Sequence, residues 1–319
     1  MAERRKTDTK AMTQPRYTGI PTFMRVPLAG EDWSGIDIGL IGVPYDGGVT
    51  NRAGARHGPR EIRNQSSFMR TIHHVTRVNP YDIAKVADLG DVLFKSLLQH
   101  PKALDEIEEV FARIKSHGIT PLTAGGDHTI SLPILRAIAK DRPVGMIHID
   151  AHTDTWDMFQ GSKFSHGSPF RNATEEGLLD PKRVIQIGIR GAQTTADGWD
   201  YSQKSGMRVV FMEEFAEIGV DAVIKEARRI VGDGPVYLSF DVDGLDPIYT
   251  PGTGTPEIGG ITTLEAQKLL RGLRHLDYVG ADVVEVAPPF DPTGNTALVA
   301  ATLMYEILCL LAERIDSKR

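Results

Sequence analysis

Acidic residues and histidines follow several apolar runs of the chain at spacings that suit metal binding. One run leads into Asp150, His152 and Asp154, and another leads into Asp241 and Asp243. If the first strand continues through its cluster, side chains at i, i+2 and i+4 point to one face. Apolar residues precede both clusters, so several carboxylates would be buried together, which is very costly unless a cation lies between them. These residues therefore predict a divalent-metal site.

A third apolar run ends in GGDH at 125–128 and adds His128 to the candidate ligands. Four aspartates and two histidines are too many for one site with an open position, and they suit two metal ions that share bridging carboxylates. An oxygen and nitrogen donor set without thiolate favours Mn²⁺ and leaves Co²⁺, Ni²⁺, Fe²⁺ and Zn²⁺ open. Two neighbouring metals turn a water into hydroxide at neutral pH, which predicts a hydrolase.

Two further residues are candidates for proton transfer and substrate binding. His166 follows the 150–154 cluster, and a loop histidine near a metal centre can shuttle protons. Glu285 ends the last apolar run, and a buried glutamate needs a cationic or hydrogen-bonding partner. A guanidinium would be a natural partner because it binds a carboxylate through two parallel hydrogen bonds.

The elements that position these residues alternate between strand and helix. Short runs rich in Val and Ile predict buried strands at 36–44, 119–126, 144–150, 183–191, 208–212, 236–243 and 278–286. Helical patterns lie at 103–118 and 220–232, and a capping box at 262–265 opens another helix. This alternation predicts a mainly parallel sheet, whose ligands bind at the carboxyl ends of its strands. An eight-stranded barrel is the alternative that length alone leaves open.

The composition is typical of a soluble globular protein, with 319 residues, 41% of them hydrophobic, and a net charge of −6. That charge argues against a nucleic-acid-binding protein, which would show a basic stripe. The single cysteine, Cys309, excludes an internal disulfide framework and favours a reducing, cytoplasmic location. Glu306 interrupts the apolar run at 297–315, so we expect a helix buried in the core or in a subunit contact rather than a membrane span.

We expect a flexible polar arm over residues 1–16 and a single catalytic domain over residues 17–319. The chain shows no obvious internal repeat and no long linker. The segment PGTGTPEIGG at 251–260 misses the third glycine of the dinucleotide-binding motif GxGxxG and does not open an obvious helix, so nucleotide binding is not expected.

The motifs of the chain resemble those of the ureohydrolase superfamily, which comprises arginases, agmatinases and related manganese amidinohydrolases. The matching motifs are GGDH at 125–128, DAHTD at 150–154, SHG at 165–167, SFDVDGLDP at 239–247, PGTGTPEIGG at 251–260 and VEVAPPFD at 284–291. The segments IPTFMRVP at 20–27 and GNTALVAATLMYEILCLLAE at 294–313 resemble the agmatinase-like branch, which includes guanidinobutyrase, guanidinopropionase and proclavaminate amidinohydrolase.

The resemblance implies a three-layer α/β/α sandwich with a mainly parallel eight-stranded sheet, and a homotrimer or homohexamer. It implies that one metal is held by His128, Asp150, Asp154 and Asp241, and the other by Asp150, His152, Asp241 and Asp243. His166 matches the proton-shuttling histidine of the family. Glu285 matches the carboxylate that binds the guanidinium, and Asp154 would also accept a proton and pass it on.

The reaction implied is hydrolysis of guanidinobutyrate, guanidinopropionate or agmatine to urea and an amine, by attack of a metal-bridging hydroxide. The chain departs from the family at Trp156, where relatives carry Asn or Tyr. With Asp157, it belongs to the loop that reads the far end of the substrate. Trp156 cannot accept a hydrogen bond, but its ring face can attract a cation or pack on an alkyl group.

Several alternatives therefore stay open beside this reading. Trp156 can line the pocket or turn outward and pack on the protein. The substrate can be free guanidine or an alkylated guanidine such as dimethylbiguanide, with Ni²⁺ as the metal. A formimino substrate, and a metal-binding subunit that assembles with a related chain, are the further alternatives.

Overall fold

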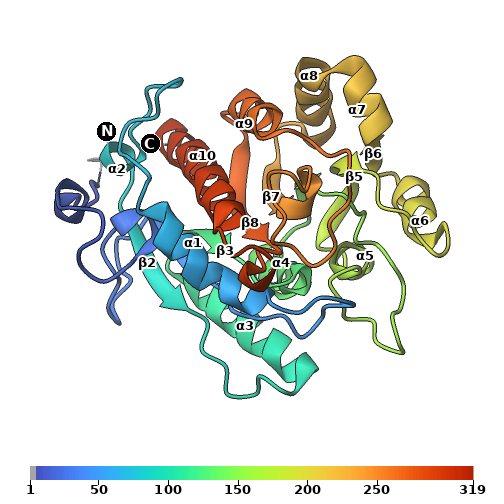
Figure 1. Cartoon of the computed structure of the whole chain (residues 1–319), viewed down its shortest axis with the longest axis horizontal. Helices are drawn as coiled ribbons and strands as arrows, with labels where there is room; N and C mark the ends of the chain where they lie inside the picture. The colour runs from blue at the N-terminus through green and yellow to red at the C-terminus, as the bar shows by residue number, and fades with distance from the viewer. Residues whose placement is uncertain (1–4, 319) are drawn as a thin grey trace.

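The computed structural model describes residues 5–318, which form one parallel sheet with helices on both faces (Figure 1). In this part of the chain the sheet has eight strands in the order β2-β1-β3-β8-β7-β4-β5-β6. Their bounds are β1 Ile38–Gly42, β2 Val86–Asp91, β3 Thr120–Ala124, β4 Val144–Ile149, β5 Leu179–Ile189, β6 Arg208–Phe211, β7 Pro235–Asp241 and β8 Asp277–Val284. Every neighbouring pair is parallel. The predicted three-layer fold is confirmed, and the sheet is open rather than a barrel.

Strands β1, β3, β4 and β7 are buried along their whole length, as expected where helices cover both faces. Each of the seven apolar runs overlaps a strand. The eighth strand, β2, was not predicted from its sequence VADLGD, because Asp88 interrupts the apolar pattern. Asp88 is buried and pairs with Arg63, whose Nε lies 3.0 Å from Asp88 Oδ2. That partner lies on another element, so the local sequence does not reveal it.

The helices divide between two hydrophobic cores, one on each face of the sheet (Figure 1). One face is covered by α1 Gly58–Ser66, α8 Val220–Val231, α9 Thr263–Gly272 and α10 Asn295–Ser317, and the other by α3 His100–Ser116, α4 Ser131–Ile138 and α5 Pro169–Glu175. The remaining helices are α2 Pro80–Ile83, α6 Asp197–Ser205 and α7 Met212–Ile218, with short 3₁₀ turns between elements. The predicted capping box opens α9, where Thr262 Oγ1 accepts from Glu265 N at 3.2 Å.

Helix α10 is long and apolar enough to cross a membrane by length and composition, but 78% of its apolar window is buried inside the domain. It packs beside α1 and against β8 (Figure 1). Its Glu306 is buried and lies 2.9 Å from His73 Nε2. These contacts identify α10 as a core helix, one of the two roles expected from the sequence.

Part of the predicted N-terminal arm contacts the domain, while residues 1–4 lie outside the described residues. The hydroxyl of Thr7 donates to the Ala84 carbonyl at 2.7 Å, and Val86 N donates to Thr7 Oγ1 at 2.8 Å. The guanidinium of Arg25 donates to three backbone carbonyls of residues 11–14. Both the flexibility of the arm and the boundary at residue 16 stay predictions.

Candidate metal centre and substrate pocket

The six candidate ligands converge where β3, β7 and β4 end, near the sheet centre, where β8 lies between β3 and β7. Around His128, its Nδ1 lies 3.2 Å from Asp150 Oδ2, 2.9 Å from Asp154 Oδ2 and 3.3 Å from Asp241 Oδ2. Around His152, its Nδ1 lies 3.2 Å from Asp243 Oδ2 and 3.5 Å from Asp150 Oδ1. The cluster thus has two parts, which share the carboxylate of Asp150.

The expectation that Asp150, His152 and Asp154 share one face of a continuing strand is wrong. Strand β4 ends at Ile149, so residues 150–154 form a turn in which Asp154 adopts a φ of +51°. The carboxylate of Asp150 stabilises the turn by accepting from His152 N at 2.6 Å. A positive φ outside glycine costs about 1–3 kcal/mol and is retained mainly at functional sites. The fold therefore aims Asp154 into the cluster by a strained turn rather than by an extended strand.

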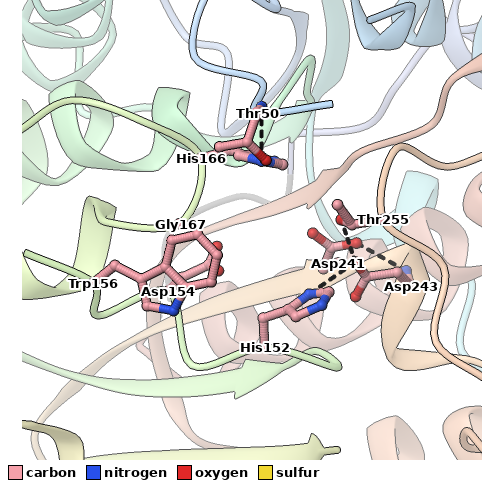
Figure 2. Close-up of a pocket in the computed structure, with 9 residues that line it drawn as sticks. All are labelled: Thr50, His152, Asp154, Trp156, His166, Gly167, Asp241, Asp243 and Thr255. Carbon is pink, nitrogen blue, oxygen red and sulfur yellow. Dashed lines mark hydrogen bonds and ion pairs between the residues drawn. The ribbon is translucent and has the colours of Figure 1, made fainter. Parts of the chain in front are cut away.

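The second acidic pair is also positioned by a turn. Strand β7 ends at Asp241, and residues 242–244 continue as the 3₁₀ turn η5 (Val242–Gly244). The Asp241 side chain caps this turn by accepting from Asp243 N at 2.8 Å. This cap fixes Asp241 and Asp243 beside each other at the same pocket, as Figure 2 shows.

The tautomer of His128 shows that the cluster fits a metal. The Ser239 hydroxyl donates to Asp282 Oδ1 at 2.6 Å, so it must accept the proton of His128 Nε2 at 2.7 Å. In the neutral ring His128 Nδ1 carries a lone pair, and among residues 5–318 it has no hydrogen-bond partner. Burial lowers the pKa of His128, but the three carboxylates raise it well above its ordinary value, so this ring stays neutral only with a cation in the site. A lone pair that faces three carboxylates is repelled by them. A divalent cation between these atoms removes the repulsion and takes four ligand atoms.

The pKa values of two of the carboxylates agree with this reading, while for Asp150 burial raises the pKa but the surrounding histidines lower it well below its ordinary value. Burial and the Asp243 and Asp150 carboxylates raise the pKa of Asp241 well above its ordinary value. Burial and the nearby Asp150 carboxylate raise the pKa of Asp243 to about 6. Without a cation, a group of buried carboxylates must bind protons to reduce its charge, and bound metal ions reverse that tendency.

Glu285 has one carboxylate oxygen without a hydrogen-bond partner among the described residues. It is 1% exposed and has a φ of +66°. Its Oε1 accepts from His128 N and from His166 Nδ1, both at 2.9 Å. Its Oε2 has no hydrogen-bond partner in the part of the chain that the structure describes. Buried carboxylate oxygens are almost always hydrogen-bonded, so this atom is suited to accept from a bound cationic ligand.

His166 lies across the pocket from Trp156 (Figure 2), and its neutral ring can accept from both the hydroxyl and the backbone N–H of Thr50. Its Nε2 lies 2.8 Å from Thr50 Oγ1 and 3.2 Å from Thr50 N. The Thr50 hydroxyl can donate to the neutral ring or accept from the protonated one. Burial lowers the pKa of His166, but the Glu285, Asp127 and Asp154 carboxylates together outweigh burial and raise this pKa to about 9.

A cavity opens onto part of this cluster, and Figure 2 shows its lining. His128, Asp150 and Glu285 are not among the residues that line it. It is lined by Thr50, His152, Asp154, Trp156, His166, Gly167, Asp241, Asp243 and Thr255. Trp156 thus faces the pocket rather than turning away from it. Asp157 does not line this cavity; its exposed carboxylate lies 3.6 Å from Arg171 and borders a second cavity, which Trp156 separates from the first.

Several buried polar residues that contact the ligands were missed from the sequence. His148 lies 2.7 Å from Asp150, while Ser239 and Asp282 hold His128. A signal existed for two of them. His148 and Ser239 are polar residues in otherwise apolar strands, two positions before Asp150 and Asp241. In a strand, that spacing places both members of each pair on the same face.

Comparison with known proteins agrees with the fold and the site. The sequence model of the arginase family matches residues 36–310. A guanidinopropionase from Pseudomonas aeruginosa is 58% identical over 300 residues, which cover 94% of each chain. The structure of proclavaminate amidinohydrolase from Streptomyces clavuligerus superposes with a TM-score of 0.90 at 39% identity, covering 94% of this chain and 100% of that one. A formiminoglutamase variant from Trypanosoma cruzi, solved with Mn²⁺, has a TM-score of 0.81 at 26% identity, covering 90% and 97% of the two chains.

Proposed function

The chain belongs to the arginase family, and we propose that it hydrolyses the guanidino group of a small compound to urea and an amine at a centre of two divalent metal ions. The observation that carries this proposal is the pair of atoms without partners in one site. Among the described residues, neither His128 Nδ1 nor Glu285 Oε2 has a hydrogen-bond partner. The first is suited to a metal and the second to a guanidinium.

Glu285, His166 and Asp154 have separate roles in the proposed reaction. When bound, two metal ions supply an activated water molecule as the nucleophile. Glu285 Oε2 accepts from the guanidinium and orients its carbon toward the metal ligands. His166, held between Glu285 and Thr50, donates a proton toward the leaving amine and regains it from solvent. Asp154, a candidate ligand carboxylate that also lines the cavity, accepts a proton from the attacking water and passes it to the leaving nitrogen.

We propose Mn²⁺ as the resident metal. The support is the donor set of carboxylate oxygens and imidazole nitrogens, together with the Mn²⁺ in the related formiminoglutamase structure. Ni²⁺ and Co²⁺ suit the same donor set and are the alternatives to test. Assembly as a homotrimer or homohexamer and a cytoplasmic location stay expectations from the sequence.

Two substrate classes are proposed, each on a separate observation. The identity of 58% to a guanidinopropionase supports a short guanidino acid. The lining of the two cavities supports a small or alkylated guanidine instead, since none of the described residues that line either cavity is Lys or Arg. A carboxylate tail would find no cationic side chain there, whereas the indole of Trp156 can pack on an alkyl group or attract a cation.

The test is urea release by metal-stripped protein that has been reloaded with Mn²⁺ or with Ni²⁺. The panel holds 3-guanidinopropionate, 4-guanidinobutyrate, agmatine, arginine, free guanidine and a dimethylbiguanide. Turnover of one compound establishes the reaction and names the substrate class. No urea from any compound, with two metal ions shown to be bound, contradicts the proposal and favours a formimino substrate or a subunit that requires a related chain.

A further inference from the structure

A buried histidine outside the predicted ligand set contacts the shared carboxylate of the cluster. His148 lies in β4, is fully buried, and its Nε2 lies 2.7 Å from Asp150 Oδ2. Its ring packs edge-on against Phe170, with centroids 4.5 Å apart. With His128, Asp150 and Asp154 it forms a group close enough to share one metal ion. His148 is therefore either a further ligand or a hydrogen-bond donor to Asp150.

Its neighbour on the next strand decides between these roles. Gln186 in β5 is the register partner of His148. The Gln186 side-chain nitrogen donates to the Thr153 carbonyl at 2.6 Å, so the amide cannot be turned around without placing two oxygens against each other. The same nitrogen lies 3.2 Å from His148 Nδ1 and donates to it. His148 Nδ1 is thus an acceptor, and the proton of the neutral ring lies on Nε2.

We propose that His148 is a positioning residue for the bridging carboxylate: Gln186 holds it in the tautomer that donates to Asp150 Oδ2 and cannot bind metal. The hydrogen bond orients Asp150 so that Oδ2 faces His128 and Oδ1 faces His152. Because Asp150 is common to both parts of the cluster, this one contact sets the geometry of both. The inference rests on the metal centre proposed above.

The experiment measures Mn²⁺ binding to the metal-stripped full chain by calorimetry and by electron paramagnetic resonance of the bound ions. Outer hydrogen bonds of this kind change metal affinity about 10- to 100-fold, so we expect the Kd to rise at least about 10-fold in His148→Phe. His148→Gln places an amide nitrogen near the former Nε2 and is expected to stay within about 3-fold of the wild type. Tyr278→Phe, which loses a buried hydrogen bond to the Leu273 carbonyl, is the matched control and leaves the Kd unchanged.

A second readout requires no metal and does not depend on the His148→Phe variant. Nitrogen-15 spectra of the metal-stripped protein, labelled at histidine, report which ring nitrogen carries the proton. A proton on Nε2 with none on Nδ1 supports the proposal, and a proton on Nδ1, with or without one on Nε2, overturns it. The His148 signal is assigned by its absence from His148→Gln, so a poorly folding His148→Phe variant does not stop the test.

The outcomes separate this inference from the proposed function. A wild-type protein that binds no divalent metal contradicts the proposed centre. A wild type that binds two ions, together with a folded His148→Phe variant of unchanged Kd, contradicts the positioning role alone. Loss of affinity in His148→Phe with recovery in His148→Gln supports it, because a merely space-filling ring would not be replaced by an amide.

Discussion

His166 and Glu285 form a buried pair, with Nδ1 of the imidazole 2.9 Å from Oε1 of the carboxylate. Two more carboxylates, those of Asp127 and Asp154, also act on the imidazole and favour its charged form. The pKa of His166 is consequently raised to about 9, which leaves the ring protonated at neutral pH. Glu285 thus holds the protonated His166 on Oε1 and leaves Oε2 for a guanidinium.

The pKa of His166 is therefore expected to depend on Glu285. In the metal-stripped protein, the His166 signal should titrate near pH 9, and Glu285→Gln should move its midpoint down toward the ordinary value of 6.5. The folded-state pKa is raised, so the pair stabilises the fold fully below about pH 6.5 and loses this effect as pH rises through about 9. Histidine NMR titration measures the midpoint. An unchanged midpoint in Glu285→Gln would mean that another group sets the pKa of His166. Glu226→Gln, which removes a distant ion pair with Arg208, is the control.

Substrate binding is expected to depend on the charge of Glu285 as well as on its shape. Glu285→Gln keeps the side-chain volume but replaces the carboxylate with an amide. A hydrogen bond to a charged group contributes up to about 3 kcal/mol, so kcat/KM should fall about 100-fold. Steady-state urea release measures this change, with Glu226→Gln again as control. A variant that retains wild-type kcat/KM would exclude Glu285 as the guanidinium site.

The fold and the convergence of the candidate ligands could be predicted because they depend on local patterns. Seven of the eight strands showed as short apolar runs, and the polar residues that follow them lie at one edge of a parallel sheet. The reasons for convergence could not be read in the same way. Asp154 reaches the cluster through a positive φ, and Asp241 and Asp243 through a capped turn. Such turns are selected by tertiary contacts, which the alternation rule does not include.

The residues that hydrogen-bond to the candidate ligands could not be predicted from the sequence either. Asp282 acts on His128 through Ser239, which lies on the neighbouring strand β7, and Gln186 acts on His148 across another strand pair. Each is a single polar residue in an apolar run, and sequence alone does not say which strands become neighbours. The order β3-β8-β7-β4-β5 supplies that information.

Removal of metal is expected to lower the stability of the fold. An ion at 100 times its Kd stabilises the state that binds it by about 2.7 kcal/mol, so two ions should raise the Tm by about 5–10 °C. Calorimetric scans with Mn²⁺ and with excess chelator measure the difference. Asp241→Asn removes a carboxylate near His128 Nδ1 and should lose most of the Mn²⁺-dependent increase. Equal Tm values for the wild type in both conditions would argue against a metal centre in the folded state.

Trp156 is expected to set substrate preference because its indole lines the cavity beside His152 and Asp154. Trp156→Asn should enlarge the pocket and shift the ratio of kcat/KM between alkylated guanidines and guanidino acids by about 10-fold or more. The measurement is urea release over the same guanidine panel. An unchanged order of preference would show that the indole packs on the protein without reading the substrate.

A substitution at Gly198, which does not line the cavity, also tests whether Trp156 sets substrate preference. A Cβ atom at Gly198 would lie 2.8 Å from Trp156 Cδ1, which is too close, while a Cβ atom at Gly167 would lie 3.0 Å from Cε3 on another part of the indole. Gly198→Ala should therefore displace the indole toward the cavity and lower kcat/KM for bulky guanidines by about 3- to 10-fold. In the Trp156→Asn background the indole is gone, so the same substitution should have little further effect, and a double-mutant cycle measures this coupling. Gly30→Ala, where the Cβ meets nothing within 4 Å, is the control. Additive effects of Gly198→Ala and Trp156→Asn would contradict a role that acts through the indole.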